Sequence, residues 1–307
     1  MKKPIIWAIG GGKGGVGKSV LSGNLGIALA KKRKQVVLID SDLGGANLHT
    51  CLGIANPQMG LSDFLSKHIR QLKDVVVPTT FPYLSLISGA RDSLNVSNPK
   101  HTQKLKILRA IRNLETEHII LDLGAGSNFN TLDFFLAADI QVIVVVPEPT
   151  SIENAYRFVK SSFYRQIRQK SPNSSIRSIV DQTIGQSDRL GFRNPHEFLA
   201  HLRTMGSEIG EFVDEQVLTF NPKLIVNQIR SSKDRRIGFA MRNACAKYFG
   251  IQLDFAGSIE YDDNVRQSII KRQPLLEIFP QSSFASGVLE VCDNLLYGRF
   301  LESEKLS

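Results

Sequence analysis

Eight residues near the start of the chain have the composition of a loop that binds phosphate groups. They read Gly12-Lys13-Gly14-Gly15-Val16-Gly17-Lys18-Ser19 and fit the pattern GxxxxGK followed by Ser or Thr. Glycines allow such a loop to turn its backbone N–H groups toward phosphate oxygens, and the helix that follows adds positive charge. Lys18 would then reach the β- and γ-phosphates of a nucleotide, and the Ser19 hydroxyl would bind Mg²⁺. The alternative is a glycine turn that only permits tight packing, which the strand and helix expected on either side disfavour.

Two apolar runs end in carboxylates, the side chains that hold Mg²⁺ in proteins. Ile119-Ile120-Leu121 leads into Asp122 and the small residues Gly124-Ala125-Gly126. In this order after a phosphate loop, Asp122 would bind Mg²⁺ through water, and the glycine turn could sense a γ-phosphate. Asp40 and Asp42 stand at alternate positions after a second apolar run. A carboxylate there suits phosphate hydrolysis, because that reaction depends mainly on positioning and electrostatics. The alternative is that each Asp only caps a turn.

Short runs rich in Val and Ile alternate with helical patterns, which is typical of repeated βαβ units. The expected strands cover residues 5–9, 35–40, 83–87, 118–122, 141–146, 223–229 and 252–259, and a helix is expected over 18–32. This pattern predicts an α/β fold, a doubly wound, mostly parallel sheet with helices on both faces. In such a sheet the ligand crevice lies at the carboxyl edge of the strands.

Residues 171–220 interrupt the alternation. A polar, turn-rich stretch, Ser171-Pro172-Asn173-Ser174-Ser175, precedes helical segments around residues 176–184 and 195–217. The strand pattern resumes at 223–229 and needs the same sheet to pair with. We therefore predict a single domain over residues 1–307 that contains a helical insertion at about 171–220.

Composition and charge place the chain among ordinary globular proteins. Its 307 residues are 42% hydrophobic and 22% charged, and no apolar run reaches the ~20 residues of a spanning helix. The net charge of +9 keeps nucleic acid and acidic membrane surfaces among the candidate partners. Cys51, Cys245 and Cys292 form no CxxC pair, so neither a disulfide framework nor a zinc or iron–sulfur site is predicted. Met1-Lys2-Lys3-Pro4 begins no signal peptide, and a cytoplasmic protein is expected.

The second lysine of the phosphate loop, Lys13, resembles the signature lysine of the deviant Walker A motif in MinD and ParA ATPases. In that family it contacts the nucleotide of the partner subunit, or the interface beside it, in an ATP-bound dimer. Such a lysine acts like an arginine finger supplied from outside. The segment Val146-Pro147-Glu148-Pro149-Thr150-Ser151 is similar to the MinD branch, and especially to FlhG (FleN), the regulators of flagellar number. A solvated loop lysine is the alternative for Lys13.

The resemblance implies roles for the site residues. Asp42 would orient or activate the attacking water, and Asp40 would help hold the hydration shell of Mg²⁺. Asn227 matches the asparagine that recognises the adenine edge, which needs both a donor and an acceptor, with a turn residue at a strand end as the alternative. Nucleotide contacts are assigned to Gly12, Lys13, Gly14, Gly15, Val16, Gly17, Lys18, Ser19, Val20 and Asn227, metal contacts to Ser19, Asp40 and Asp122, and catalysis to Lys13, Lys18 and Asp42. Val20 and Glu260 stand where many relatives have threonine and proline.

The resemblance implies a molecular switch. The chain would bind and hydrolyse Mg-ATP, slowly and with stimulation by a partner, dimerise with ATP, and regulate the positioning or assembly of a protein partner. ParA-like partition on non-specific DNA and a nucleotide-dependent adaptor with negligible hydrolysis are the alternatives.

Two groups of basic residues are candidates for DNA contact, and a solvated helix face is an equal alternative for both. They are Arg157, Lys160, Arg165, Arg168, Lys170 and Arg177 in the first group, and Arg230, Lys233, Arg235, Arg236, Arg242 and Lys247 in the second. Direct membrane binding is disfavoured, because residues 288–297 have the apolar spacing of a core-packing helix and are followed by Glu302 and Glu304.

Overall fold

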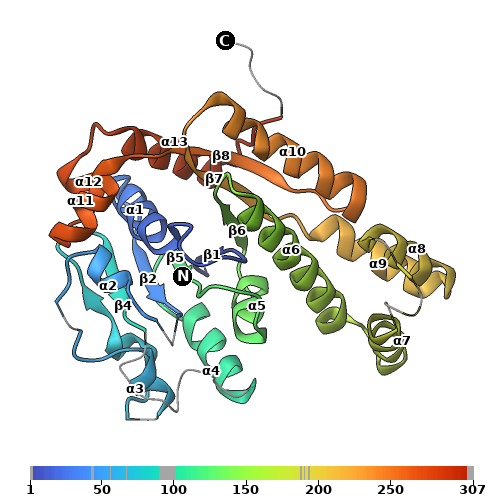
Figure 1. Ribbon diagram of the computed structural model, residues 1–307. Helices are drawn as coiled ribbons and strands as arrows, with labels where there is room; N and C mark the ends of the chain where they lie inside the picture. The colour runs from blue at the N-terminus through green and yellow to red at the C-terminus, as the bar shows by residue number, and fades with distance from the viewer. Residues whose placement is uncertain are drawn as a thin grey trace.

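The computed structural model describes residues 3–42, 45–55, 57–66, 68–89, 101–186, 189, 191–192 and 194–302 (Figure 1). Its centre is an eight-stranded sheet in the order β3-β4-β2-β5-β1-β6-β7-β8, in which only the β3–β4 pair of the described strands is antiparallel. The strands are β1 (Ile5–Gly10), β2 (Val36–Asp40), β3 (Val77–Pro78), β4 (Leu84–Ile87), β5 (His118–Asp122), β6 (Ile140–Val145), β7 (Lys223–Ile229) and β8 (Asp254–Glu260). All seven expected strands are confirmed, each starting within two residues of its expected start. The sequence did not indicate β3, because two residues carry no periodic pattern.

Helices cover both faces of the sheet (Figure 1). They are α1 (Lys18–Lys31), α2 (Leu48–Cys51), α3 (Leu61–Leu65), the 3₁₀ turn η1 (Leu72–Val75), α4 (His101–Arg112), α5 (Phe129–Leu136), α6 (Pro149–Lys170), α7 (Ser174–Gly185), α8 (Pro195–Thr204), α9 (Ser207–Thr219), α10 (Ser232–Phe249), α11 (Asp263–Lys271), α12 (Leu275–Ile278) and α13 (Ser283–Tyr297). Alternate side chains of β1 enter two hydrophobic cores, with Ile6 and Ala8 under α4, α5 and α6, and Trp7 and Ile9 under α1 and α13. The doubly wound α/β class is thus confirmed.

The segment 171–220 forms α7, α8 and α9, which project from the end of α6 (Figure 1). One helical stretch expected over 195–217 is two helices, because the chain turns at Gly206, where φ is +144°. Ile176, Phe198 and Val213 belong to the same hydrophobic core as Phe163 of α6. The inserted helices therefore extend the core on one face of the sheet, and the assignment of a single domain stays a prediction.

The last helix, α13, lies in the core as its spacing predicted. Val288, Val291, Cys292 and Leu295 are buried, and the helix packs against α1 and β8. Among the described helices, none is both long enough and apolar enough to cross a membrane.

Candidate functional site

The phosphate loop runs from the carboxyl end of β1 to the first turn of α1, in the centre of the sheet. Two of its glycines are required by close approach and by conformation. A Cβ on Gly12 would lie 2.1 Å from the carbonyl oxygen of Asn154, and Gly17 has a φ of +91° with a Cβ position 2.6 Å from Nδ2 of Asn227. Gly17 is the residue before α1, so the loop ends where the backbone N–H groups of the helix are unpaired.

Lys18 is the first residue of α1 and turns back into the loop. Only 8% of Lys18 is exposed, and its Nζ donates to the carbonyl oxygen of Lys13 over 3.3 Å. Burial lowers the pKa of Lys18, while the nearby carboxylates of Asp122 and Asp42 oppose that shift. The ammonium group is therefore held inside the phosphate loop before any phosphate is bound, which is the position its predicted role requires.

Asp122 ends β5 beside the start of α1. It is fully buried, and burial raises its pKa to about 6, against hydrogen bonds from Ser19 and Ser22 and the charge of Lys18. The Ser22 hydroxyl donates to Oδ1 of Asp122 over 3.0 Å. The two residues assigned to Mg²⁺ on this side of the loop, Ser19 and Asp122, are thus brought together by the fold.

Asp40 and Asp42 reach the same edge from β2, which pairs with β5 so that Asp40 lies opposite Asp122. Both oxygens of Asp40 accept backbone N–H groups, from Asp42 over 3.2 Å and from Leu48 over 3.0 Å. This is the geometry of the turn-capping alternative. Burial and the charge of Asp122 raise the pKa of Asp40 to about 7. Asp42 is half-buried, and its carboxyl carbon lies 3.1 Å from the position of a Cβ on Gly124.

The donors at this edge fit Mg²⁺ together with a bound nucleotide. The carboxylates of Asp42 and Asp122 lie near the ammonium group of Lys18, and the carboxylate of Asp40 lies near both of them, so a divalent cation would balance negative charge at this edge. Within the described residues, no three His, Cys, Asp or Glu side chains form a metal-binding group. Mg²⁺ usually takes one or two carboxylates and completes its octahedron with water and phosphate oxygens. The arrangement suits that mode of binding better than a cage made by protein alone.

Lys13 lies at the mouth of the loop and contacts the start of α6. Its Nζ donates to Oε2 of Glu148 over 2.5 Å and to Oγ1 of Thr150 over 3.1 Å, and about a third of its side chain is exposed. The two acceptors belong to the segment 146–151 that supported the family resemblance. Lys13 is therefore an ion-paired residue on the rim of the site, and its contact with a second subunit stays a prediction.

Asn227 lies at the end of β7, directly beneath the phosphate loop. Its Nδ2 donates to the carbonyl oxygen of Val16 over 2.9 Å, and its Oδ1 accepts the N–H of Gln228 over 2.9 Å. Nδ2 keeps one further N–H donor, and Oδ1 keeps one further acceptor position. Asn227 thus fixes the phosphate loop to the sheet, and adenine recognition by its remaining hydrogen-bonding capacity stays a prediction.

Two residues at the site were not assigned from the sequence. Ser22 lies three residues after Ser19, on the side of α1 that faces Asp122, and this helical spacing was the available signal. The backbone N–H and hydroxyl of Ser41 both donate to the carbonyl oxygen of Asp122, over 3.0 and 2.7 Å. These two hydrogen bonds of Ser41 connect the loop after β2 to β5, and nothing in the sequence around Ser41 indicated them.

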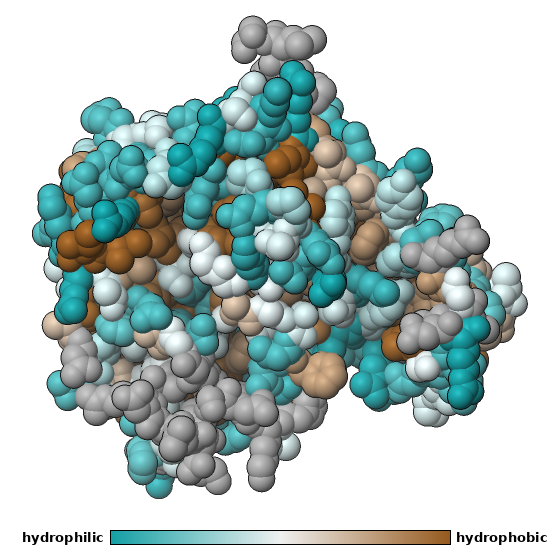
Figure 2. Space-filling model, in the orientation of Figure 1, coloured by the Kyte–Doolittle hydropathy of each residue, from teal (hydrophilic) through white to brown (hydrophobic). Residues whose placement is uncertain are grey.

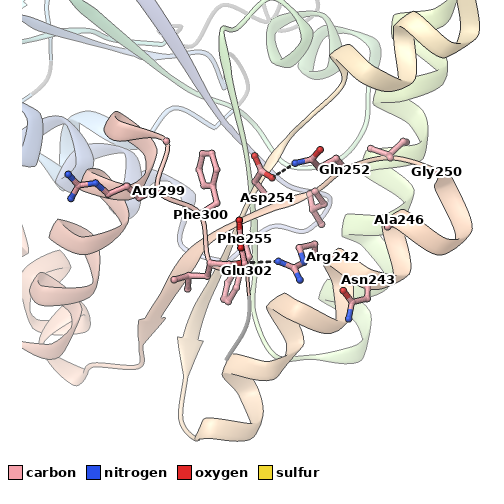
Figure 3. Close-up of a pocket in the computed structure, with 14 residues that line it drawn as sticks. Arg242, Asn243, Ala246, Gly250, Gln252, Asp254, Phe255, Arg299, Phe300 and Glu302 are labelled. Atoms are coloured by element: carbon pink, nitrogen blue, oxygen red, sulfur yellow. Dashed lines mark hydrogen bonds between the residues drawn. The ribbon is translucent and has the colours of Figure 1, made fainter. Parts of the chain in front are cut away.

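A pocket of about 950 Å³ lies beside the amino end of the outermost strand β8, between α10, the start of β8 and the segment after α13 (Figure 3). Its polar groups bind one another. Asp254 accepts from Lys223, Asn221 and Gln252 over 2.7 to 2.9 Å, and Arg242 donates to the carbonyl oxygen of Leu301 over 3.0 Å. None of the residues assigned to nucleotide or metal lines it, so the candidate functional site is the carboxyl edge around the phosphate loop.

Comparison with known proteins identifies a nucleotide-binding family. Residues 7–275 match the family described as the CobQ/CobB/MinD/ParA nucleotide binding domain. The antiactivator FleN of Pseudomonas aeruginosa is 27% identical over 281 residues, which cover 90% of this chain and 81% of FleN.

Two solved structures show the same fold. The cell division ATPase MinD of Pyrococcus furiosus has a TM-score of 0.65 at 18% identity, and the match covers 95% of this chain and 98% of that one. The septum site-determining protein MinD of Pyrococcus horikoshii, complexed with Mg-ADP, has a TM-score of 0.64 at 20% identity, with 96% and 98% covered.

Proposed function

The chain belongs to the CobQ/CobB/MinD/ParA nucleotide-binding domain family, and on this premise we propose that it is a switch driven by Mg-ATP. It hydrolyses ATP slowly, dimerises with ATP bound, and regulates the positioning or assembly of a protein partner. The similarity to FleN, an antiactivator, and the Mg-ADP bound to a MinD of the same fold support this proposal.

The observation that carries the proposal is the meeting of four side chains at one edge of the sheet. Lys18 and Ser19 come from the phosphate loop, Asp122 from β5 and Asp42 from the loop after β2. Ser19 and Asp122 would hold Mg²⁺, which when bound would neutralise charge on the phosphate oxygens. Lys18 would orient the β- and γ-phosphates, and Asp42 would orient the attacking water, since phosphoryl transfer depends mainly on positioning and electrostatics.

Lys13 connects hydrolysis to dimerisation in this proposal. Its ammonium group is paired with Glu148 on the rim of the site and does not enter its own phosphate loop. In an ATP-bound dimer it would leave Glu148 and Thr150 and add positive charge beside the nucleotide of the other subunit. One chain alone would then bind the nucleotide, but the transferred phosphoryl group would lack the positive charge that Lys13 of the second subunit supplies.

The test is the mass of the protein in solution by light scattering, with Mg-ATP or Mg-ADP. The Asp42→Ala variant, which should bind ATP and not cleave it, is expected to be a dimer with Mg-ATP and a monomer with Mg-ADP. Lys13→Ala is expected to bind fluorescent ATP normally, to stay monomeric and to lose cooperative turnover. Lys34→Ala serves as the matched control, because Lys34 forms an exposed ion pair with Glu117 at the opposite edge. Unchanged turnover in Lys13→Ala would contradict the cross-subunit role.

Non-specific DNA binding is a second candidate function, and one specific observation favours it. The arginines of α6 are partly neutralised, since Arg157 pairs with Glu153, Arg165 with Asp133 and Arg168 with Asp181. By contrast, Lys233 and Arg235 at the start of α10 are exposed and make no ion pair with a carboxylate of the described residues. The second basic group is thus better suited to phosphate contact than the first.

Duplex DNA of arbitrary sequence distinguishes the two functions. The ATP-trapped Asp42→Ala protein should bind it strongly at low salt and weakly at moderate salt if the chain acts on DNA. Adding Lys233→Ala and Arg235→Ala should then lower the slope of log affinity against log salt by about two, close to one unit for each phosphate contact. Adding Arg157→Ala instead should change the slope little. Absence of ATP-dependent binding would leave the protein-partner function.

A further inference from the structure

Hydrophobic side chains reach the surface of the molecule in several places, as Figure 2 shows, and such exposure alone marks no ligand site. At the amino edge of the sheet, however, they surround a polar side chain that is itself buried. β1 begins there at Ile5 and β5 begins there at His118, and the two residues are partners in the sheet. The nucleotide edge is at the other end of the same strands, since Asp122 lies four residues beyond His118, about 13 Å along β5.

A cavity of about 860 Å³ lies at this amino edge, within the size range of sites for small organic molecules. Its apolar lining comes from the start of β1, the segment between α4 and β5, and the end of α13. We call the cavity the β1–β5 pocket, and its apolar lining residues are Pro4, Ile5, Leu114, Leu296 and Tyr297. Ile5 and Tyr297 are 43% and 58% exposed, so part of this apolar lining is left uncovered.

His118 also lines the β1–β5 pocket, and one of its ring nitrogens is already bound. The indole N–H of the fully buried Trp7 donates to Nδ1 of His118 over 3.2 Å. Because an indole nitrogen can only donate, Nδ1 must accept, and the proton of the neutral ring lies on Nε2. Burial lowers the pKa of His118, which keeps the ring neutral near pH 7. Trp7 thus fixes both the orientation and the tautomer of this histidine.

The Nε2–H of His118 has no hydrogen-bond acceptor among the described residues. Only 4% of His118 is exposed, yet Nε2 is not sealed in the core, because it is absent from the fully buried polar atoms without a partner. Buried donors in proteins normally have an acceptor, and leaving one unmade is costly. The β1–β5 pocket therefore combines apolar walls with one oriented donor, which is the usual composition of a small-molecule site.

The charges around the pocket balance one another. Lys34 pairs with Glu117 over 3.1 Å, and Arg112 pairs with Asp139 over 3.6 Å. The remaining charged residues of the lining are one lysine and one glutamate, Lys3 and Glu115. An ionised carboxylate placed against the neutral ring of His118 would thus gain no net positive charge to offset its loss of water. An uncharged acceptor fits this donor better.

We propose that the β1–β5 pocket is a second ligand site, which takes an uncharged small molecule with an apolar body and a carbonyl acceptor. The apolar body would pack against Ile5, Leu296 and Tyr297, and the carbonyl oxygen would accept from Nε2 of His118. None of the residues assigned to nucleotide or metal lines the pocket, so this inference does not rest on the proposed function.

The test is titration of the full chain with 3-phenylpropanamide, followed by the NMR signals of the histidine rings in ¹⁵N-labelled protein. Before the probe is added, His118 should show a proton on Nε2 and an unprotonated Nδ1. The Nε2–H signal should then shift with a dissociation constant of about 1–5 mM, the affinity expected for a ligand of this size. Saturating Mg-ADP should not displace the probe, because nucleotide is expected at the opposite edge.

Two analogues of the same length test the class of ligand. 3-Phenylpropionate replaces the amide by a carboxylate and should bind several-fold more weakly. 3-Phenylpropylammonium has no acceptor and should leave the His118 signals unchanged. Tighter binding of the carboxylate than of the amide would overturn the assignment to an uncharged ligand.

Two variants test the donor and the wall separately. His118→Phe keeps a flat ring without the donor and should weaken binding of the amide about three- to tenfold. Tyr297→Ser removes apolar lining and should weaken it about fivefold or more. Tyr248→Ser is the matched control, because Tyr248 is also about half exposed and also lies beside a cation, but on α10 outside the pocket.

Thermal unfolding shows whether each variant is folded. His118→Phe leaves the N–H of Trp7 without an acceptor, so if that variant is unstable, Tyr297→Ser alone decides. His118 signals that do not respond to the amide would overturn the proposal. So would displacement of the amide by Mg-ADP, or an equal loss of affinity in Tyr297→Ser and Tyr248→Ser.

Discussion

Asp122 and Asp133 are both buried carboxylates, with 2% and 7% of the residue exposed, yet their surroundings are opposite. Burial would raise the pKa of Asp133, but hydrogen bonds and charge from Arg165 and Lys104 outweigh it and lower the pKa. Burial raises the pKa of Asp122 to about 6, since only hydroxyl groups and the more distant Lys18 favour its charged form. Asp133 therefore has its cations within the chain, whereas Asp122 forms no ion pair with a cation of the described residues.

This difference distinguishes a structural carboxylate, Asp133, from Asp122, the carboxylate proposed to bind Mg²⁺. Asp133 on α5 accepts from Lys104 of α4 over 2.5 Å and from Arg165 of α6 over 2.7 and 3.0 Å, so it joins three helices on one face of the sheet. Asp122 joins no such set, and its raised pKa beside a phosphate loop is the pattern expected where a cation arrives with a ligand. Burial alone would not distinguish the two residues.

The largest expected effect is on stability, from Asp133→Asn. The change leaves Lys104 and Arg165 charged and mostly buried without a carboxylate, which should cost about 3–5 kcal/mol of unfolding free energy. Urea denaturation measures it. Asp181→Asn is the control, because the Arg168–Asp181 pair is largely exposed and should contribute about 0–1 kcal/mol. Equal losses for the two variants would contradict the distinction.

Asp122→Asn should act in the opposite way, with a large effect on activity and little on stability. Without a carboxylate for Mg²⁺, ATP turnover should fall by about 10²–10³, the usual cost of removing one group that stabilises charge in the transition state. The midpoint of thermal unfolding should be unchanged or higher, because the amide replaces a group whose charged form burial disfavours. Turnover close to wild type would exclude Asp122 from the site.

The pH dependence of stability should show the two kinds of carboxylate separately. Asp40 and Asp122 have pKa values of about 7 and about 6 in the folded chain, above the ordinary 3.8, so the folded state keeps protons that the unfolded state has lost. Their contribution to stability is fully present below about pH 4 and is lost as the pH rises through about 6 to 7. Asp133 and Asp254, whose pKa values are lowered, contribute above about pH 4 and lose that contribution as the pH falls further.

Without nucleotide, Asp40→Asn/Asp122→Asn should therefore flatten the fall in unfolding free energy between pH 5 and pH 8, by on the order of 4 kcal/mol. Urea denaturation at several pH values measures the slope. Asp133→Asn should lower stability over the whole of this range without changing that slope. A slope that the double variant leaves unchanged would mean that these two carboxylates ionise normally.

The smallest expected effect comes from Ser22→Ala, which removes the hydroxyl that donates to Asp122. A hydrogen bond to a charged group contributes about 1.5–3 kcal/mol, and Ser19 still donates, so the affinity for Mg-ATP should fall only a few-fold. Titration with a fluorescent ATP analogue at fixed Mg²⁺ measures it. A loss as large as that of Asp122→Asn would mean that Ser22 itself binds the metal.

Much of the fold and of the site followed from local pattern. The alternation of Val and Ile runs with helical segments placed all seven main strands, and GxxxxGK followed by Ser placed the phosphate loop after β1. Periodicity alone indicated one continuous helical stretch where the structure has two helices separated at Gly206. The sequence could not indicate this break, because the φ of +144° at Gly206 is a property of the folded backbone. Arg157, Arg165 and Arg168 were predicted to be a candidate DNA surface because their acidic partners are not adjacent in the sequence. Those partners lie on other helices or one helical turn away.

The sequence by itself determined which groups could act, because glycine, lysine, serine and aspartate in this order have few other uses. It also indicated where those groups would meet, since apolar runs that lead to Asp122 and Asn227 belong at the carboxyl edge of a parallel sheet. Only the tertiary structure decided which charges are neutralised. Whether Asp122 or Asp133 meets a cation, and whether Lys13 or Arg266 meets a carboxylate, depends on side chains brought together from distant parts of the chain, and no local pattern records those distances.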